Sequence, residues 1–483
     1  MRINATRPYI SESLGFAFNP RRIAVIGASR QPNKVGFEVL KALLDRHYGG
    51  EVLPVNPNAA EIQGLPAYKG VRAIPGPIDL AFIALPAMAT SKVVEECAEK
   101  SVHAVAVAAG GFRESGNDDL EASLIHCCRT HHMALLGPNF LTIGNPHANF
   151  SCGLAPYEPA SGSLAAISQS GANLLAILGA STIGAFGLSF YVGLGNKADV
   201  DFSELIEFAG QDTNTRCVAL YVEGLDSEDA FVASCRKVAP RKPILVLKGG
   251  TSTLGWSAAM AHTGSNPGTV DNRTDRLFHE AGAIRVRTLG ELIDGGLALT
   301  LMPPLKGENI VIVTNGGGSG LLMTDEFERR GINLRELRQF SPRLRDRINK
   351  LNPRPSSCLN PIDLGGAARA EEYREVVALL LADPDTHGVA VSICPTLLTP
   401  VQDIVLELAD CYNSGPKSKP IIVEIQGGAD CDAAILGLRR CGIPAYATPE
   451  RAVAAFNILR RYMLRRYELE ETSAPAVMQT TCV

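Results

Sequence analysis

The chain has 483 residues, which is enough for about three domains of ordinary size. Hydrophobic residues make up 46% of it and charged residues 20%, as in a typical globular protein. The net charge of −4 argues against a surface for nucleic acid, and no apolar run reaches the roughly 18 residues of a membrane span. The N-terminus lacks the apolar run of a signal peptide, so we expect a cytoplasmic protein with reduced cysteines.

In chain order, short aliphatic strands alternate with helical segments. The first part of the chain predicts strands at residues 22–26, 51–55, 80–85 and 104–107. Each is followed by turn residues and then by a segment of helical periodicity. This alternation predicts a parallel sheet with helices on both faces. The histidine- and cysteine-containing stretch at 126–132 fits no structural zinc spacing, so we expect no metal site there or elsewhere.

The strand pattern restarts twice, near residue 162 and near residue 309, the second time after Pro303-Pro304. We therefore predict three α/β units and a final helix near residues 449–470. The expected domains are residues 1–147, 148–303 and 304–470, followed by a disordered tail at 471–483.

The loop after the first strand, residues 27–36, is rich in small residues. Such a loop lets the backbone approach an anion, and the following helix directs its amide groups and positive dipole end toward it. Ser29 stands where a dinucleotide motif has its second glycine. The second strand ends in Asn56-Pro57 instead of an acidic residue for the ribose. The loop therefore favours a phosphorylated nucleotide other than NAD, with a plain tight turn as the alternative.

Two further strand-to-helix loops have the same character. One is Ser168-Gln169-Ser170-Gly171, and the other spans residues 313–320 and contains three consecutive glycines. Hydroxyl groups and glycine at a helix N-terminus can hold a phosphate without a charged side chain. One such loop at the start of each predicted sheet indicates a protein that handles phosphate groups.

One histidine, His262, stands apart from the others. It lies near the far end of a long loop of small residues that follows a predicted strand at 244–247. Its imidazole can act as a nucleophile or general base there, or it can be an ordinary surface residue. Glu223 follows another predicted strand, and its carboxylate can hold one imidazole nitrogen while the other remains free to attack.

With these residues in view, the chain resembles the ADP-forming acyl-CoA synthetases, relatives of succinyl-CoA synthetase. The resemblance covers about residues 15–465 and is to the α, CoA-ligase part. Further matching segments are residues 137–139, 168–172, 195–201 and 360–363. The histidine loop matches most closely, at Lys248, Gly249, Thr251, Gly255, Ala258, Ala259, His262, Thr263, Gly264 and Gly268.

The resemblance implies an α/β fold with a Rossmann-like CoA-binding domain followed by two flavodoxin-like parallel α/β domains. It implies that His262 accepts a phosphoryl group, that Glu223 orients the phosphohistidine, and that the helix after Ser168 binds phosphate together with Gln169, Ser170 and Gly171. Coenzyme A would lie against Gly27, Ser29, Gln31, Lys34, Asn56, Pro57 and Pro86.

The implied reaction converts acyl-CoA, ADP and phosphate into a carboxylic acid, CoA and ATP through an acyl phosphate and a phosphohistidine. No segment of this chain reads as the ATP-grasp nucleotide domain. The resemblance therefore implies a hetero-oligomer with a separate ATP-grasp β subunit that binds magnesium with ADP or ATP.

Some positions depart from the family pattern. Asn58 stands where a lysine is frequent, Phe140 where a cysteine is usual, and Asn173 where a leucine is usual. The alternative is therefore a CoA-binding paralogue whose activity is lost or altered, for example to carbamoyl transfer. An NAD-dependent oxidoreductase conflicts with the first loop, and a non-enzymatic scaffold leaves the histidine loop unexplained.

Overall fold

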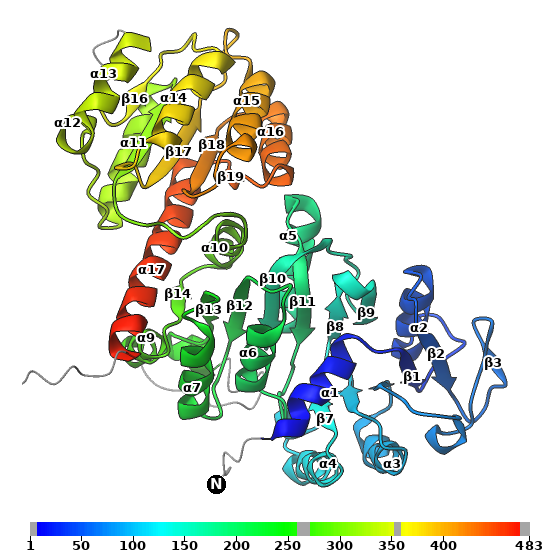
Figure 1. Cartoon of the computed structure of the whole chain (residues 1–483). Coiled ribbons are helices and arrows are strands. Elements are labelled where there is room, and N and C mark those ends of the chain that lie inside the picture. Colours follow the sequence, from blue (N-terminus) through cyan, green and yellow to red (C-terminus); the bar gives the residue numbers. More distant parts are fainter. Residues whose placement is uncertain (1–6, 258–270, 352–358, 474–483) are drawn as a thin grey trace, which may run out of the picture. The chain divides into compact units, whose positions relative to one another are not determined.

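The computed structural model describes residues 7–257, 271–351 and 359–473 (Figure 1). The chain divides into two compact units, which are described separately. The first unit contains the chain up to Ile183 together with Gly187–Leu289. The second contains Gly184–Phe186 and the chain from Gly290 onward. Among the described residues, no helix combines the length and the apolar character that a bilayer-spanning segment needs.

The first sheet of the first unit is fully parallel. Its strands, in spatial order, are β2 (Glu51–Val55), β1 (Arg22–Ile26), β5 (Leu80–Ile83), β6 (Ala104–Val107) and β7 (Ala134–Leu136). The connections contain α2 (Val35–Asp45), α3 (Ala87–Glu99), α4 (Asp118–Thr130), the hairpin β3 (Glu61–Ile62) and β4 (Leu65–Pro66), and the short helices η1 (Val71–Ala73) and η2 (Arg113–Ser115). The chain moves from β1 to β2 and then returns to the other side of β1, so the order reverses between β1 and β5. In open α/β sheets, ligands bind at the carboxyl ends of the strands beside such a reversal.

The residues of β5 and β6 are buried throughout. Their continuous aliphatic runs fit strands covered on both faces. One core cluster joins β1, β2, β5 and β6 to α3, α4 and η1. The predicted bounds of β1, β2 and β6 agree with the structure, and β5 ends two residues before the predicted end.

The second sheet of the first unit is mixed. Its spatial order is β14 (Ile284–Val286), β13 (Ile244–Lys248), β12 (Cys217–Val222), β10 (Ser161–Ser168), β11 (Leu188–Gly193), β8 (Thr142–Asn145) and β9 (Phe150–Gly153). Strands β10 to β14 are parallel, whereas β8 pairs antiparallel with β11 and with β9. The accompanying helices are α5 (Gly171–Gly184), α6 (Phe202–Gln211), α7 (Glu228–Val238), α9 (Asp271–Glu280) and η3 (Pro146–Ala148). The expected parallel sheet is thus extended by an antiparallel hairpin at one edge.

An N-terminal helix, α1 (Pro8–Phe18), packs against elements of both sheets. The ring of Phe18 lies 4.7 Å from that of Phe190 in β11 and 4.9 Å from that of Phe208 in α6. The ring of Phe16 stacks on His103, just before β6, at 3.7 Å. Helix α1 therefore holds the two sheets of this unit together.

The second unit has a third sheet, which is fully parallel. Its spatial order is β16 (Ile362–Asp363), β15 (Ile310–Thr314), β17 (Gly388–Ile393), β18 (Ile421–Ile425) and β19 (Ala445–Tyr446). Its helices are α10 (Leu289–Leu301), α11 (Gly317–Arg329), α12 (Leu337–Phe340), α13 (Pro342–Leu351), α14 (Ala370–Ala382), α15 (Val401–Ser414), α16 (Ala429–Arg440) and α17 (Pro449–Ser473). Because α17 continues to Ser473, the first residues of the predicted tail are helical, and residues 474–483 lie outside the described residues.

Candidate functional site

A cleft of about 930 Å³ lies at the carboxyl ends of β1, β2, β5 and β6 in the first sheet. Gln31 is the one predicted CoA residue that does not line it. Its backbone N–H instead donates to the Ser29 hydroxyl at 3.0 Å and so shapes the loop. The predicted residues that line the cleft are Gly27, Ser29, Lys34, Asn56, Pro57 and Pro86.

Two glycines allow the loop after β1 to pack tightly beneath α2. A Cβ on Gly27, whose φ is 83°, would lie 2.6 Å from the carbonyl oxygen of Ala84. A Cβ on Gly36 would lie 2.0 Å from the carbonyl oxygen of Gly27. Neither α2 nor α3 has a side-chain cap at its N-terminus. Their first residues line the cleft or border it, so backbone N–H groups are available to an anion there.

Asn56 braces this cleft from within. Its side-chain amide donates to the carbonyl oxygen of Ala28 at 2.7 Å, and its Oδ1 accepts from the backbone N–H of Asn58 at 2.8 Å. The side chain thereby links the loop after β1 to the loop after β2. Without a bound ligand, these two hydrogen bonds of Asn56 hold the two loops in position.

Sequence reasoning missed two basic residues of the cleft. Lys69 follows the β3–β4 hairpin, and Lys92 lies on α3. Both line the cleft together with Lys34. Neither belongs to a glycine-rich loop or a strand end, so nothing in the local sequence marks them. The two lysines reach the cleft only because the segment before η1 and helix α3 both pack at this edge of the first sheet in the folded chain.

A second candidate site lies at the carboxyl ends of the adjacent strands β10, β12 and β13. The side-chain oxygen of Gln169 accepts from the backbone N–H groups of Glu223 and Gly224 at 2.9 and 3.1 Å. The Nζ of Lys248 donates to the carbonyl oxygen of Glu223 at 2.8 Å. The Ser168 hydroxyl donates to the carbonyl oxygen of Ser170 at 2.7 Å, and α5 begins at the next residue. The structure therefore brings Glu223 together with the predicted phosphate loop.

Glu223 is buried, with 6% of the residue exposed, and its carboxylate lies close enough to Tyr221 to affect the pKa of that phenol. Burial and, after it, the negative charge of Glu223 raise the pKa of Tyr221 to about 12. The phenol therefore stays protonated at neutral pH and can donate to the carboxylate. Asn173 lies on the first turn of α5, where its backbone N–H donates to the Ser170 hydroxyl at 3.4 Å, and it acts to lower the pKa of Tyr221. His262 follows β13 in the sequence and lies outside the described residues.

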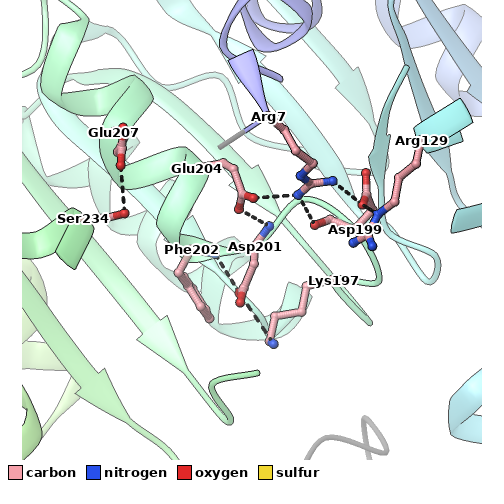
Figure 2. A network of polar contacts seen from close by, with 9 residues as sticks. All are labelled: Arg7, Arg129, Lys197, Asp199, Asp201, Phe202, Glu204, Glu207 and Ser234. Carbon is pink, nitrogen blue, oxygen red and sulfur yellow. Dashed lines mark hydrogen bonds and ion pairs between the residues drawn. The ribbon is translucent and has the colours of Figure 1, made fainter. Parts of the chain in front are cut away.

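The segment at residues 195–201 matches the family pattern but has no predicted role. It forms ion pairs around two buried side chains, Lys197 and Asp199 (Figure 2). The Lys197 side chain is fully buried, and its Nζ lies 2.8 Å from Asp226 Oδ2 and 3.5 Å from Asp201 Oδ1. Burial raises the pKa of Asp201, and the Lys197 charge opposes that rise. Lys197 follows β11 and Asp226 follows β12, the strands on either side of β10. Their ion pair therefore joins the loops that flank the predicted phosphate loop.

Asp199 in the same segment anchors two helices (Figure 2). Its buried carboxylate forms an ion pair with Arg7, at the start of α1, and accepts from Arg129 of α4 at 2.7 Å. Arg7 also contacts Glu204 of α6 at 2.6 Å. This network fixes the loop after β11 against the first domain.

The third glycine-rich loop lies in the second unit, between β15 and α11. The Ser319 hydroxyl, in the first turn of α11, donates to Glu424 Oε2 at 3.0 Å, and the Ser392 hydroxyl donates to Ser319 at 2.8 Å. Burial raises the pKa of Glu424. Gly317 and Gly318 leave the start of α11 exposed, whereas Ser168, Gln169 and Ser170 in the loop after β10 are buried. The loop therefore has the form expected of an anion site, with a buried acid beneath it.

Comparisons with known proteins agree with this geometry. A CoA binding domain matches residues 21–146, a succinyl-CoA ligase like flavodoxin domain matches residues 161–299, and a ligase-CoA domain matches residues 310–466. The chain is 37% identical to subunit alpha of the ADP-forming acetate–CoA ligase I of Pyrococcus furiosus, over 93% of this chain and 98% of that protein. It is 36% identical to the ADP-forming acetate–CoA ligase of Methanocaldococcus jannaschii, over 92% of this chain and 63% of that longer protein.

A solved structure is also similar over nearly the whole chain. It is acetyl-coenzyme A synthetase 1 of Candidatus Korarchaeum cryptofilum in complex with phosphate and ADP, with a TM-score of 0.91 and 34% identity. The match covers 96% of this chain and 99% of that one. The chain therefore belongs to the family of ADP-forming acyl-CoA synthetase α subunits, and is an acid–thiol ligase with a Rossmann-like CoA-binding domain followed by two flavodoxin-like domains.

Proposed function

We propose that this chain is the CoA-ligase subunit of an enzyme that interconverts acyl-CoA, ADP and phosphate with a carboxylic acid, CoA and ATP. The observation that carries this proposal is the meeting of Glu223, the Ser168–Gly171 loop and Lys248 at three adjacent strand ends. The histidine loop begins directly after Lys248 in the sequence. A carboxylate beside a helix N-terminus suits a site in which an imidazole and a phosphate react.

The proposed steps balance without a redox partner. An oxygen of inorganic phosphate attacks the thioester carbon, the C–S bond breaks, and CoA leaves as the thiolate. The neutral imidazole of His262 then attacks the phosphorus of the acyl phosphate, and the carboxylate leaves. The phosphoryl group passes from His262 to the terminal oxygen of ADP. Glu223 stabilises the positive charge that develops on the imidazole.

The nucleotide half of the reaction is assigned to an ATP-grasp β subunit, which would bind magnesium with ADP or ATP. Two observations support a partner. The P. furiosus relative is named as a subunit alpha, and the M. jannaschii relative extends well beyond the matched region. The active form would then be a hetero-oligomer in which His262 carries the phosphoryl group between subunits.

Reconstitution tests the reaction. The chain is purified with a candidate β subunit, and ATP formation is measured from ADP, phosphate and a panel of acyl-CoA thioesters that begins with acetyl-CoA. ATP should form only when both subunits are present, and a His262→Asn variant should form none. If the two subunits together bind CoA but make no ATP from any thioester, the alternative is favoured, in which the chain is a CoA-binding paralogue with lost or altered activity.

A further inference from the structure

Basic side chains dominate the charged lining of the cleft in the first sheet. Lys34, Lys69 and Lys92 line it, and among the described residues Glu96 is the one acidic residue there. The Glu96 carboxylate already lies 3.7 Å from the Arg72 guanidinium. None of the three ammonium groups makes a hydrogen bond or ion pair with the residues that the structure describes. The cleft therefore presents positive charge that the protein itself does not neutralise.

The three lysines form two groups. Lys34 immediately precedes α2, beside the glycine loop. Lys69 and Lys92 lie near α3: a Cβ on Gly70 would be 3.6 Å from the Glu96 carboxylate, and Lys92 is one helical turn before Glu96. The crossover through α2 leads from β1 toward one edge of the sheet and the crossover through α3 leads toward the other, so the two helices cover opposite faces.

Coenzyme A also carries its charge in two groups, a diphosphate and a phosphate monoester on the ribose. Each of the two phosphates in the diphosphate has one negative charge, and backbone N–H groups at a helix N-terminus can hold their oxygens. A monoester carries close to two charges at neutral pH, which calls for cationic side chains. Asn58 also lines the cleft, but its neutral side chain supplies no positive charge.

We propose that Lys69 and Lys92 bind the ribose 3′-phosphate of CoA, while the N-terminus of α2 and Lys34 hold the diphosphate. This assignment rests on the proposed function, because it takes CoA as the occupant of the cleft. It makes Lys69 and Lys92 the residues that distinguish CoA from nucleotides without a ribose phosphate, such as dephospho-CoA and NAD.

Titration calorimetry with CoA and with dephospho-CoA tests the assignment. Wild-type protein should bind CoA more tightly. Lys69→Ala and Lys92→Ala should each lower CoA affinity about tenfold, the loss of one charged contact at a partly exposed site. Both variants should bind dephospho-CoA with an affinity within about twofold of the wild-type value. The double variant should bind the two ligands about equally well.

Two controls separate the possible failures. Lys34→Ala should weaken both ligands to a similar degree. Lys41→Ala removes an exposed lysine of α2 that pairs with Asp45 outside the cleft, and it should bind both ligands like wild type. If Lys69→Ala and Lys92→Ala weaken the binding of CoA and dephospho-CoA equally, the assignment is wrong although the cleft still binds CoA. The same conclusion follows if they weaken the binding of neither ligand. If wild-type protein binds no CoA, the proposed function itself fails.

Discussion

Glu223 is held in place from several directions. Gln169 and Lys248 fix its backbone, and its carboxylate is buried beside Tyr221, whose pKa its charge raises. A buried carboxylate with this many restraints has little freedom to move away from the strand ends. Such rigidity is what a positioning residue for a reacting imidazole needs, because small displacements of a catalytic partner are costly.

We expect Glu223→Gln to slow the reconstituted enzyme by about one to two orders of magnitude without unfolding it. The variant replaces a charged hydrogen bond with a neutral one, a change of about 1.5–3 kcal/mol, and each 1.36 kcal/mol is about tenfold in rate. Steady-state ATP formation measures the effect. Glu228→Gln, at a partly exposed carboxylate five residues later that pairs with Arg273, is the matched control. Wild-type turnover in a folded Glu223→Gln variant would remove Glu223 from the mechanism.

Residues of the cleft differ in how well the sequence predicts them. Gly27, Ser29 and Lys34 belong to a strand–loop–helix motif whose geometry is local, and they line the cleft as expected. Lys69 and Lys92 come from segments without a motif, and only the tertiary fold brings them there. Asn56 was expected to contact CoA, and in the protein alone its polar atoms hold the two loops together. A side chain that braces a site and one that binds its ligand look alike in sequence.

At the scale of elements, the contact between α2 and the loop after β1 is the tightest in the cleft. Gly36→Ala would place a methyl group against the Gly27 carbonyl oxygen, so α2 has to shift. We expect a loss of about 1–3 kcal/mol in stability from this overpacking, together with weaker CoA binding. Thermal melting and CoA titration measure both. Gly49→Ala, where a Cβ has nothing within 4 Å, is the control. If Gly36→Ala and Gly49→Ala had the same melting temperature and the same CoA affinity, this role for Gly36 would be contradicted.

The loops after β11 and β12 depend on the buried Lys197 ion pairs. Lys197→Met would leave Asp226 and Asp201 without their cation, and breaking such a pair costs about 3–5 kcal/mol. Denaturant unfolding at neutral pH should show this loss, and adding Asp226→Asn should restore part of it. Without Lys197 the already raised pKa of Asp201 rises further. The folded state then takes up protons more readily than the unfolded state, so the deficit should shrink as the pH falls through that pKa. If the loss of unfolding free energy in Lys197→Met did not change with pH, the proposed protonation of Asp201 would be contradicted.

Elements with strong local signals were predicted well. Strands β1, β2 and β6 are short, mainly aliphatic segments bounded by turn residues, and their predicted bounds agree with the structure. The antiparallel strands β8 and β9 and helix α1 were not predicted. Strand β8 is short, and its pairing depends on β11, nearly fifty residues later. Helix α1 is defined by its packing on Phe190 and Phe208, which no local pattern reveals.

At the scale of the whole molecule, loops of small residues follow β1, β10 and β15, one in each of the three large sheets, as the repeated pattern indicated. The departures from the family pattern are accommodated in different ways. Phe140 is 2% exposed and packs edge-on against Phe82, so it is a core residue. Asn173 donates its backbone N–H to the Ser170 hydroxyl in the predicted phosphate loop, and both it and Glu223 affect the pKa of Tyr221. Of the two, only Asn173 is placed to influence the proposed chemistry.

The central claim is that His262 carries the phosphoryl group, and intact-mass analysis tests it most directly. The chain is incubated with a candidate β subunit and magnesium-ATP, and the site of any added group is mapped on peptides. We expect one phosphoryl group on His262, stable in alkali and lost in mild acid, and none on a His262→Asn variant. A His262→Asn variant that still accepts phosphate, or a stable label on another residue of the wild-type chain, would contradict the account.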